Sequence, residues 1–182
     1  MLILASSSPR RAKLLKDAGL DFIVVPSHLE EFVDEKYKPA ELVLELAKQK
    51  ALSVAAKYPD DVIIGADTIV VFEDQVLGKP RDEEDAYRML RLLSNDRHVV
   101  YTAVALVKGD QVKSFVSESE VWMKNLSDLE IKNYIKTGEP MDKAGAYAIQ
   151  GEGGQLVDHY KGDFFTIVGL PLKELLEQLK NL

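Results

Sequence analysis

The sequence of 182 residues contains no cysteine, and this absence excludes several kinds of chemistry. Without thiols there is no disulfide framework, no cysteine nucleophile and no zinc site built from thiolates. The histidines are few and scattered, at His28, His98 and His159, so they form neither a metal-binding motif nor part of a catalytic triad. If the chain binds a metal, carboxylates are therefore the expected ligands.

Long apolar runs and an excess of positive charge are also absent. No apolar run approaches the roughly 20 residues that span a bilayer, and residues 1–5 are too short for a signal peptide. We therefore expect a cytoplasmic protein without a membrane segment. The 23 basic residues against 30 acidic ones give a net charge of −7, which argues against nucleic-acid binding through a broad basic surface.

Standard nucleotide-binding motifs are missing as well, since the sequence has neither a Walker A pattern nor G-x-G-x-x-G. Ordinary P-loop and Rossmann interpretations are therefore unsupported. A negatively charged protein that binds phosphates must place its few cations locally. A divalent cation would help to neutralise a polyphosphate ligand.

The patterns that are present predict an α/β protein. Apolar runs of strand length alternate with amphipathic stretches, and 182 residues suit one domain or two small lobes. The expected strands at 98–107 and 112–123 form an antiparallel pair, which makes the sheet mixed. Further strands are expected at 2–5, 21–26, 61–72 and 75–77, with mixed strand and turn at 157–168. Helices are expected from residue 9, over 39–58, 82–94 and 127–138, and from residue 171.

The stretch around which the chain is organised, residues 2–11, predicts a buried strand, a serine loop and a helix start. Ser8 is a good N-cap and Pro9 fits the first helical position. Arg10 and Arg11 are unusual there, because each cation at a helix N-terminus costs about 0.3–1 kcal/mol. Together with loop hydroxyls and backbone N–H groups, the two arginines would bind a phosphate. The alternative is that both are solvated surface residues.

Asp67 interrupts the longest strand-like run. A carboxylate there must be paired, bind a metal or point into a cleft, because an uncompensated buried charge is costly. Gly65 indicates a bend or a close backbone approach nearby. A two-residue hairpin turn at 73–74 would place Thr68 opposite Lys79 and so bring Lys79 beside Asp67. The alternative is that Asp67 is a structural carboxylate at a strand break.

Three other features could contribute to a site. Glu30 and Glu31 are expected in a solvated loop; the alternative is that one of them shares a divalent cation with Asp67. Lys50 is by default a surface lysine on its helix. Residues 139–151 are rich in small and charged residues, and Gln150 offers both a donor and an acceptor for a base edge. The alternative for this stretch is a tight connecting loop.

Seven segments, taken together, resemble the Maf family of nucleoside triphosphate pyrophosphatases, also called septum formation inhibitors. They are residues 5–11, 48–51, 65–68, 78–80, 139–147, 149–151 and 168–171, in the family order. The resemblance implies a mixed sheet flanked by helices with a central cleft, related to the house-cleaning inosine triphosphatases. It covers residues 1–182 as one domain, with two lobes around the cleft.

The same resemblance implies hydrolysis between the α and β phosphates, which gives a nucleoside monophosphate and pyrophosphate. It also implies a Mg²⁺ or Mn²⁺ requirement and a homodimer. Arg10, Thr68 and Gln150 are similar to the subgroup that prefers dTTP and UTP. Modified pyrimidine nucleotides are alternative substrates. A nucleotide-binding regulator of cell division without turnover is the alternative function.

Roles for individual residues also follow from the resemblance. Asp67 would accept a proton from water, and Glu31 with Asp67 would hold the metal. Phosphates would be bound by Ser6, Arg10, Arg11, Lys50 and Lys79. The base would be selected by Arg10, Thr68 and Gln150, and Asp142 and Lys143 would lie elsewhere in the cleft. The sequence departs from the family pattern at Asn95, in the turn at 73–74 and at 162–166.

Overall fold

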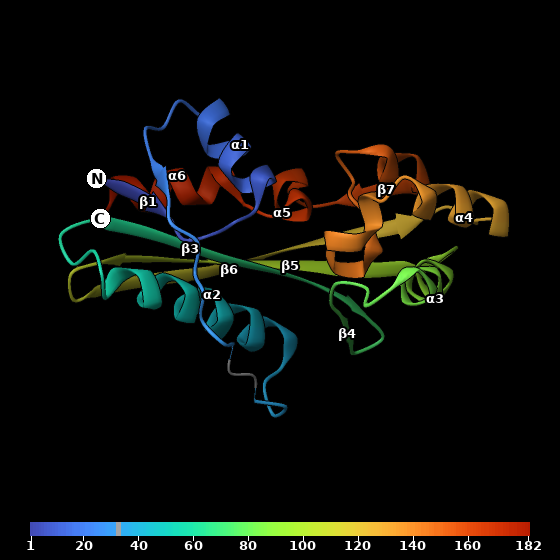
Figure 1. Ribbon diagram of the computed structural model, residues 1–182, viewed down its shortest axis with the longest axis horizontal. Helices are drawn as coiled ribbons and strands as arrows, with labels where there is room; N and C mark the ends of the chain where they lie inside the picture. Colours follow the sequence, from blue (N-terminus) through green and yellow to red (C-terminus); the bar gives the residue numbers. More distant parts are fainter. Residues whose placement is uncertain (32–33) are drawn as a thin grey trace. The chain divides into compact units, whose positions relative to one another are not determined.

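The computed structural model describes residues 1–31 and 34–182. The strands of this described part form a seven-stranded sheet in the order β2-β1-β3-β5-β6-β7, with β4 paired to β3 (Figure 1). β1 pairs in parallel with β2 and β3, whereas β3 with β4 and β6 with β7 are antiparallel. The predicted α/β fold with a mixed sheet is therefore confirmed.

The element bounds follow the sequence patterns closely for the long elements. The strands are β1 (Leu2–Leu4), β2 (Ile23–Val24), β3 (Val62–Phe72), β4 (Gln75–Leu77), β5 (Arg97–Lys108), β6 (Gln111–Met123) and β7 (Val157–Lys161). The helices are α1 (Pro9–Asp17), α2 (Pro39–Ala55), α3 (Glu83–Leu93), α4 (Asp128–Lys136), α5 (Phe164–Val168) and α6 (Leu172–Lys180). Three short 3₁₀ helices are η1 (Glu139–Asp142), η2 (Ala144–Ala146) and η3 (Glu152–Leu156).

The chain divides into two compact units. Unit 1 comprises residues 1–68, 102–117 and 169–182, and unit 2 comprises residues 69–101 and 118–168. Strands β3, β5 and β6 each contribute residues to both units. Each contact between the candidate site residues joins residues of the same unit.

Unit 1 is built on β1 and the first part of β3. In Figure 1, α2 lies on one face of these strands and α1 with α6 on the other. Buried leucines and isoleucines of α1, α6 and the strands form its core, among them Leu4, Leu15, Ile64, Leu106 and Leu175. On the other face, α2 comes so close to β3 that a Cβ on Gly65 would lie 2.5 Å from the Ala47 carbonyl oxygen. The predicted close approach at Gly65 is therefore confirmed.

Predicted helix starts are confirmed by side chains that cap the first turn. Ser8 accepts a hydrogen bond from the Arg11 backbone at 3.4 Å, with Pro9 in the first helical position. Asp82 caps α3 in the same way, and Ser127 forms a capping box on α4. These caps satisfy N–H groups that the helix itself leaves without partners.

Three local predictions are wrong. Residues 21–26 form a strand only at Ile23–Val24, and the expected strand and turn at 157–168 ends in helix α5. The apolar pattern of residues 39–58 predicts Leu52 on the buried side of its helix, together with Leu42, Leu46 and Ala47. Leu52 is instead 46% exposed, because α2 packs through its alanines at Gly65. The buried residues of α2 are Val43, Leu46, Ala47, Ala51 and Val54.

The core of unit 2 contains a buried histidine. His98 is 1% exposed, and its Nε2 lies 2.6 Å from the Tyr147 hydroxyl. Within the described part of the chain its Nδ1 is buried without a hydrogen-bond partner. Burial lowers the pKa of His98 from its ordinary value of 6.5 to about 3, and the charge of Arg97 adds to this effect. The native state therefore holds His98 neutral.

We expect this histidine to make the protein less stable in mild acid. Between the two pKa values the unfolded chain binds a proton that the folded chain does not, so stability falls as the pH is lowered. The free energy of unfolding should drop by about 2 kcal/mol from about pH 7.5 to about pH 5 through this group alone. Urea unfolding of His98→Gln should show a flatter pH dependence than wild type. His28→Gln, which makes the same substitution at an exposed position, is measured in parallel. An unchanged slope in His98→Gln would contradict the assignment.

Candidate active site

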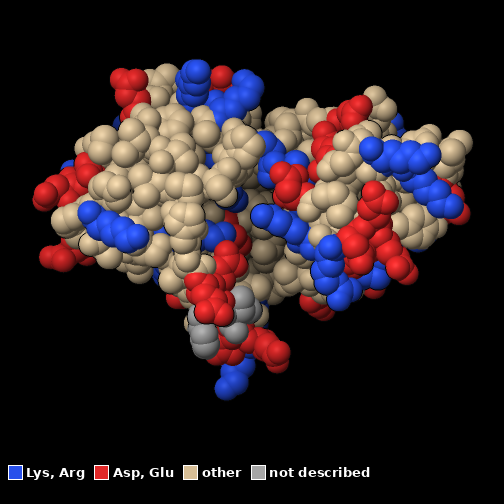
Figure 2. Space-filling model, viewed as in Figure 1, with Lys and Arg blue, Asp and Glu red and all other residues tan. Residues whose placement is uncertain are grey.

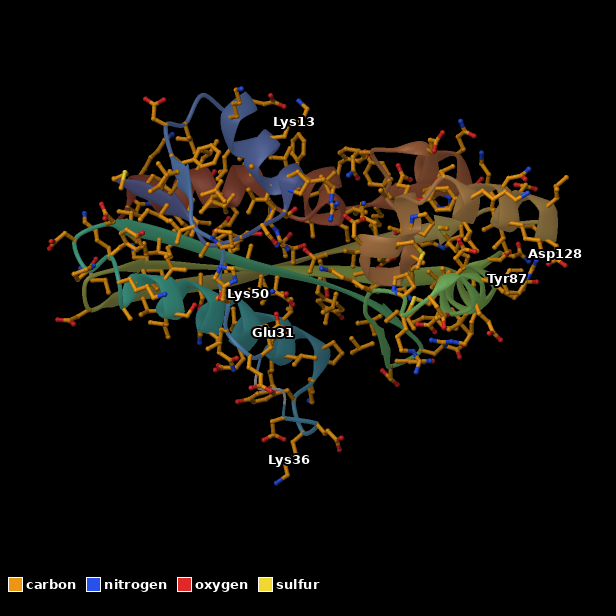
Figure 3. The ribbon with its side chains drawn as sticks, in the orientation of Figure 1. Lys13, Glu31, Lys36, Lys50, Tyr87 and Asp128 are labelled. Carbon is orange, nitrogen blue, oxygen red and sulfur yellow. The ribbon has the colours of Figure 1, made fainter. Side chains whose placement is uncertain are left out.

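Asp67 lies on β3 with a side chain that is 13% exposed, and its partner is a lysine from α2. Lys50 Nζ donates to Asp67 Oδ1 at 2.5 Å and forms a second ion pair with Glu31 Oε1 at 3.0 Å. Figure 3 shows Lys50 and Glu31 in this region of unit 1. The predicted need of Asp67 for a partner is confirmed. The default view of Lys50 as a surface lysine is wrong, because its side chain is 19% exposed.

The sequence of α2 explains how Lys50 reaches Asp67. Ala47 and Ala51 flank Lys50 and contact β3 at Gly65, two residues before Asp67. Small residues on both elements let the helix lie close to the strand. A lysine on this face of the helix then extends along the strand to the carboxylate.

Glu31 and Asp67 form a donor set that fits a divalent cation. One oxygen of each carboxylate contacts the Lys50 ammonium group, so the two carboxylates face the same position. Mg²⁺ is commonly held by one or two carboxylates, with substrate phosphates and water as the remaining ligands. No group of three or more His, Asp or Glu residues that could hold a metal occurs in residues 1–31 and 34–182. The contact with Lys50 favours Glu31 over Glu30 as the second carboxylate.

Arg11 connects the serine loop, β3 and the segment before α6. Its guanidinium donates to the Gly169 carbonyl at 2.8 Å, to Ser6 Oγ at 3.1 Å and to Thr68 Oγ1 at 3.0 Å. Burial lowers the pKa of Arg11, and the negative charge of Asp67 opposes that effect. Three of its five N–H donors are thus used inside unit 1, and the other two make no further hydrogen bond within the described residues.

Unit 1 therefore brings together most of the predicted site residues. Arg11 holds Ser6 and Thr68, while Lys50 holds Glu31 and Asp67. The two groups are linked through β3, where Asp67 and Thr68 are consecutive residues whose side chains point to opposite faces, and the charge of Asp67 acts on Arg11. Arg10 lies half-buried in the first turn of α1. Unit 1 thus holds one ion-pair network on Lys50 and one hydrogen-bond network on Arg11.

Two members of this network were missed from the sequence. Thr102 Oγ1 lies 2.9 Å from Thr68 Oγ1, and the Gly169 carbonyl accepts from Arg11. Thr102 is fully buried within the apolar run of β5. Thr102 could have been identified from the sequence as Asp67 was, because a polar residue inside an apolar strand needs a hydrogen-bond partner.

In unit 2 the predicted hairpin is confirmed in part. Phe72 pairs with Gln75 across the turn, and the pairing continues to Val70 with Leu77. The pairs keep the predicted register, and β4 ends at Leu77 as predicted. Lys79 is exposed beyond that end, and its position beside Asp67 stays a prediction. The proline that follows Lys79 lacks an N–H group and cannot continue a strand ladder.

The other predicted residues of unit 2 lie on the loop after α4. Lys143 forms an ion pair with Asp142 and donates to the Glu139 carbonyl at 3.3 Å, so it folds back on its own loop. Gln150 is exposed at a turn closed by a 3.2 Å hydrogen bond from Gly151 N to the Ala148 carbonyl. Within the described residues its side-chain amide makes no hydrogen bond and is available to a ligand.

Charged side chains on the face drawn in Figure 2 are of both signs and interspersed, and the described residues form no broad basic patch there. Across residues 1–31 and 34–182, none of the helices combines the length and the apolar character needed to cross a membrane.

Comparison with known proteins gives matches over the whole chain. The family described as Maf-like protein matches residues 1–182. A dTTP/UTP pyrophosphatase of Thermoanaerobacter sp. (strain X514) is 50% identical, over 99% of this chain and 95% of the relative. The dTTP/UTP pyrophosphatase of Acholeplasma laidlawii is also 50% identical, over 100% of this chain and 96% of its own. The dTTP/UTP pyrophosphatase of Geobacillus sp. (strain WCH70) is 48% identical, over 100% of this chain and 97% of the relative.

Solved structures with the same fold are more distant in sequence. The Ham1 protein of Staphylococcus aureus superposes with a TM-score of 0.55 at 18% identity, covering 99% of this chain and 98% of that one. A HAM1 protein of Coxiella burnetii superposes with a TM-score of 0.54 at 14% identity, covering 100% of this chain and 98% of that one. At such identities the likeness concerns the fold. The match at high identity extends from one end of the sequence to the other, and the chain belongs to the Maf family.

Proposed function

We propose that this protein hydrolyses dTTP and UTP between the α and β phosphates, releasing the nucleoside monophosphate and pyrophosphate. The observation that carries the proposal is the joint contact of Asp67 and Glu31 with Lys50, beside the network of Arg11. Relatives that are 45–50% identical and bear the name dTTP/UTP pyrophosphatase support the choice of substrate.

In the proposed reaction Asp67 orients a water molecule and accepts its proton. The water oxygen forms a bond to the α-phosphorus, and the bond from that phosphorus to the bridging oxygen breaks. Such general-base assistance contributes about 10²–10⁴-fold. The geometry supports this role because Asp67 is partly buried and fixed in direction by Lys50.

Cationic and hydroxyl groups bind the phosphates in this proposal. Lys50, Ser6 and the two arginines of α1 hold charge and N–H or O–H donors in fixed positions, the arrangement that favours phosphoryl chemistry. Lys79 is assigned the same role from the family resemblance. A Mg²⁺ or Mn²⁺ held by Glu31 and Asp67 would offset charge on the triphosphate and the leaving pyrophosphate.

Base selection is assigned to Arg10, Thr68 and Gln150. The exposed amide of Gln150, which makes no hydrogen bond within residues 1–31 and 34–182, supports this assignment. Asp142 and Lys143 are proposed as further residues near the substrate. A homodimer, proposed from the family resemblance, and a cytoplasmic location, proposed from the sequence composition, complete the proposal.

The test is product analysis of the purified protein with Mg²⁺ and a panel of dTTP, UTP, CTP, 7-methyl-GTP and ITP. We expect monophosphate and pyrophosphate from dTTP and UTP at higher kcat/KM than from the other nucleotides. A parallel reaction with excess EDTA should show no turnover. Tight binding without cleavage of any nucleotide would overturn the proposal in favour of a nucleotide-binding regulator. A preference for 7-methyl-GTP would overturn the choice of substrate.

A further inference from the structure

The carboxylate of Glu139, at the start of η1, holds the loop at residues 148–154 from one side. Its Oε1 accepts from Glu152 N at 3.1 Å and its Oε2 from Gly153 N at 2.9 Å. The Tyr134 hydroxyl of α4 donates to the same Oε2. A carboxylate that accepts three hydrogen bonds fixes the groups that donate them.

Tyr134 completes the arrangement from the helix. Its hydroxyl also accepts from Ala148 N at 3.0 Å, and its side chain is 5% exposed. Burial, together with the hydrogen bond to Glu139, raises the pKa of Tyr134, so the phenol keeps the proton that it donates. One buried side chain thus joins Glu139 to the first residue of the loop.

Glycines allow the loop to approach these two side chains. A Cβ on Gly151 would overlap the carboxylate of Glu139, and a Cβ on Gly153 would lie 2.6 Å from the Tyr134 hydroxyl. Neither glycine has a positive φ, so close approach is the reason for them here. The loop is therefore shaped to fit Tyr134 and Glu139 on both sides of Gln150.

Gln150 is the exposed residue in the middle of this loop. Its backbone lies between Ala148, which Tyr134 holds, and residues 152–153, which Glu139 holds. A glutamine amide can present a donor and an acceptor to many partners, so selectivity requires that its backbone be fixed. Neither Tyr134 nor Glu139 needs to touch the substrate to have this effect.

We infer that Tyr134 and Glu139 are positioning residues that hold Gln150 in place and thereby set the preference for uracil and thymine over cytosine. The inference rests on the proposed function, in which Gln150 contacts the base. It assigns to the loop at 139–154 a part in specificity that a tight connecting loop would not have.

The test uses Tyr134→Phe, which keeps the buried ring and removes only the hydroxyl, and Glu139→Gln as a second variant. We expect kcat/KM for dTTP to fall about 10- to 100-fold, through KM more than kcat, with little change for CTP. The ratio of the two kcat/KM values is the decisive readout, because a general loss of stability lowers both values together. Tm is measured for each variant.

Tyr87→Phe provides a matched control. Tyr87 belongs to the same unit and donates from its hydroxyl to Asp128 at 2.6 Å, so the substitution removes the same kind of bond (Figure 3). The dTTP to CTP ratio of Tyr87→Phe should equal that of wild type. An equal fall in this control and in Tyr134→Phe would overturn the inference.

A parallel Gln150→Ala variant separates failure of the inference from failure of the proposed function. If Gln150→Ala lowers the ratio and both positioning variants retain it, the positioning role is overturned and base reading by Gln150 stands. If Gln150→Ala retains the ratio, both are overturned. If wild type cleaves nothing, the same ratio is measured from binding of the α,β-imido triphosphates of uridine and cytidine. An unchanged binding ratio in Tyr134→Phe would then overturn the inference.

Discussion

Replacing Asp67 with asparagine is expected to lower kcat for dTTP by about 10²–10⁴-fold, the range for loss of a general base. Asparagine has nearly the same size, and its amide oxygen can still accept from Lys50. Lys50 also keeps its ion pair with Glu31 at 3.0 Å, so the substitution leaves no unpaired cation. The variant should therefore fold normally and bind nucleotide while losing the group that takes the proton from water.

The measurement is kcat and KM for dTTP with saturating Mg²⁺, together with Tm. Asp74→Asn is the matched control, because Asp74 is exposed in the turn after β3 and asparagine tolerates its φ of 65°. The control should keep wild-type kcat. Wild-type turnover in Asp67→Asn would refute the catalytic role. A large loss of Tm would assign Asp67 to structure instead.

The sequence predicted best those features that depend on a few neighbouring residues. The caps at Ser8 and Ser127 form between residues three positions apart, so the local pattern contains all the information that they need. The same holds for the two-residue turn that pairs Phe72 with Gln75. The expectation that Asp67 must have a partner rests on the cost of burying a charge, so it could be made without knowing the fold.

Features set by packing between distant segments were not predictable in this way. Lys50 is 17 residues from Asp67, and their contact depends on how α2 lies on β3. The wrong assignment of Leu52 has the same origin, because α2 packs through alanines that a hydrophobic pattern ranks below leucine. Helix α5 contains residues that favour strands, and tertiary context determines its structure.

Gly65→Ala is expected to lower both stability and activity, since Gly65 governs the distance between α2 and β3. A Cβ there would lie 2.5 Å from the Ala47 carbonyl oxygen and 2.7 Å from both Cβ and N of Ala51. Two of these three atoms belong to the backbone, so the helix must move away from the strand. We expect the free energy of unfolding to fall by about 3 kcal/mol, the upper part of the range for overpacking.

The same movement should impair catalysis, because Lys50 lies on α2 between the two alanines and Asp67 lies on β3. A shift of about 1 Å in a positioned group can cost about 100-fold, so kcat/KM for dTTP should fall by that order. Urea unfolding and steady-state kinetics measure the two effects on one preparation. Gly78→Ala is the matched control, since a Cβ there meets nothing within 4 Å, and its stability should equal or exceed that of wild type.

Adding Ala51→Gly to Gly65→Ala distinguishes a backbone collision from a side-chain one. The second change removes the Ala51 Cβ but leaves the Ala47 carbonyl oxygen and the Ala51 N in place. We therefore expect the double variant to remain as unstable as Gly65→Ala and to regain no activity. Full recovery of stability and activity would show that only the Ala51 side chain, and not the helix backbone, limits the space at position 65. In that case the contact between Lys50 and Asp67 would not depend on the absence of a side chain at position 65.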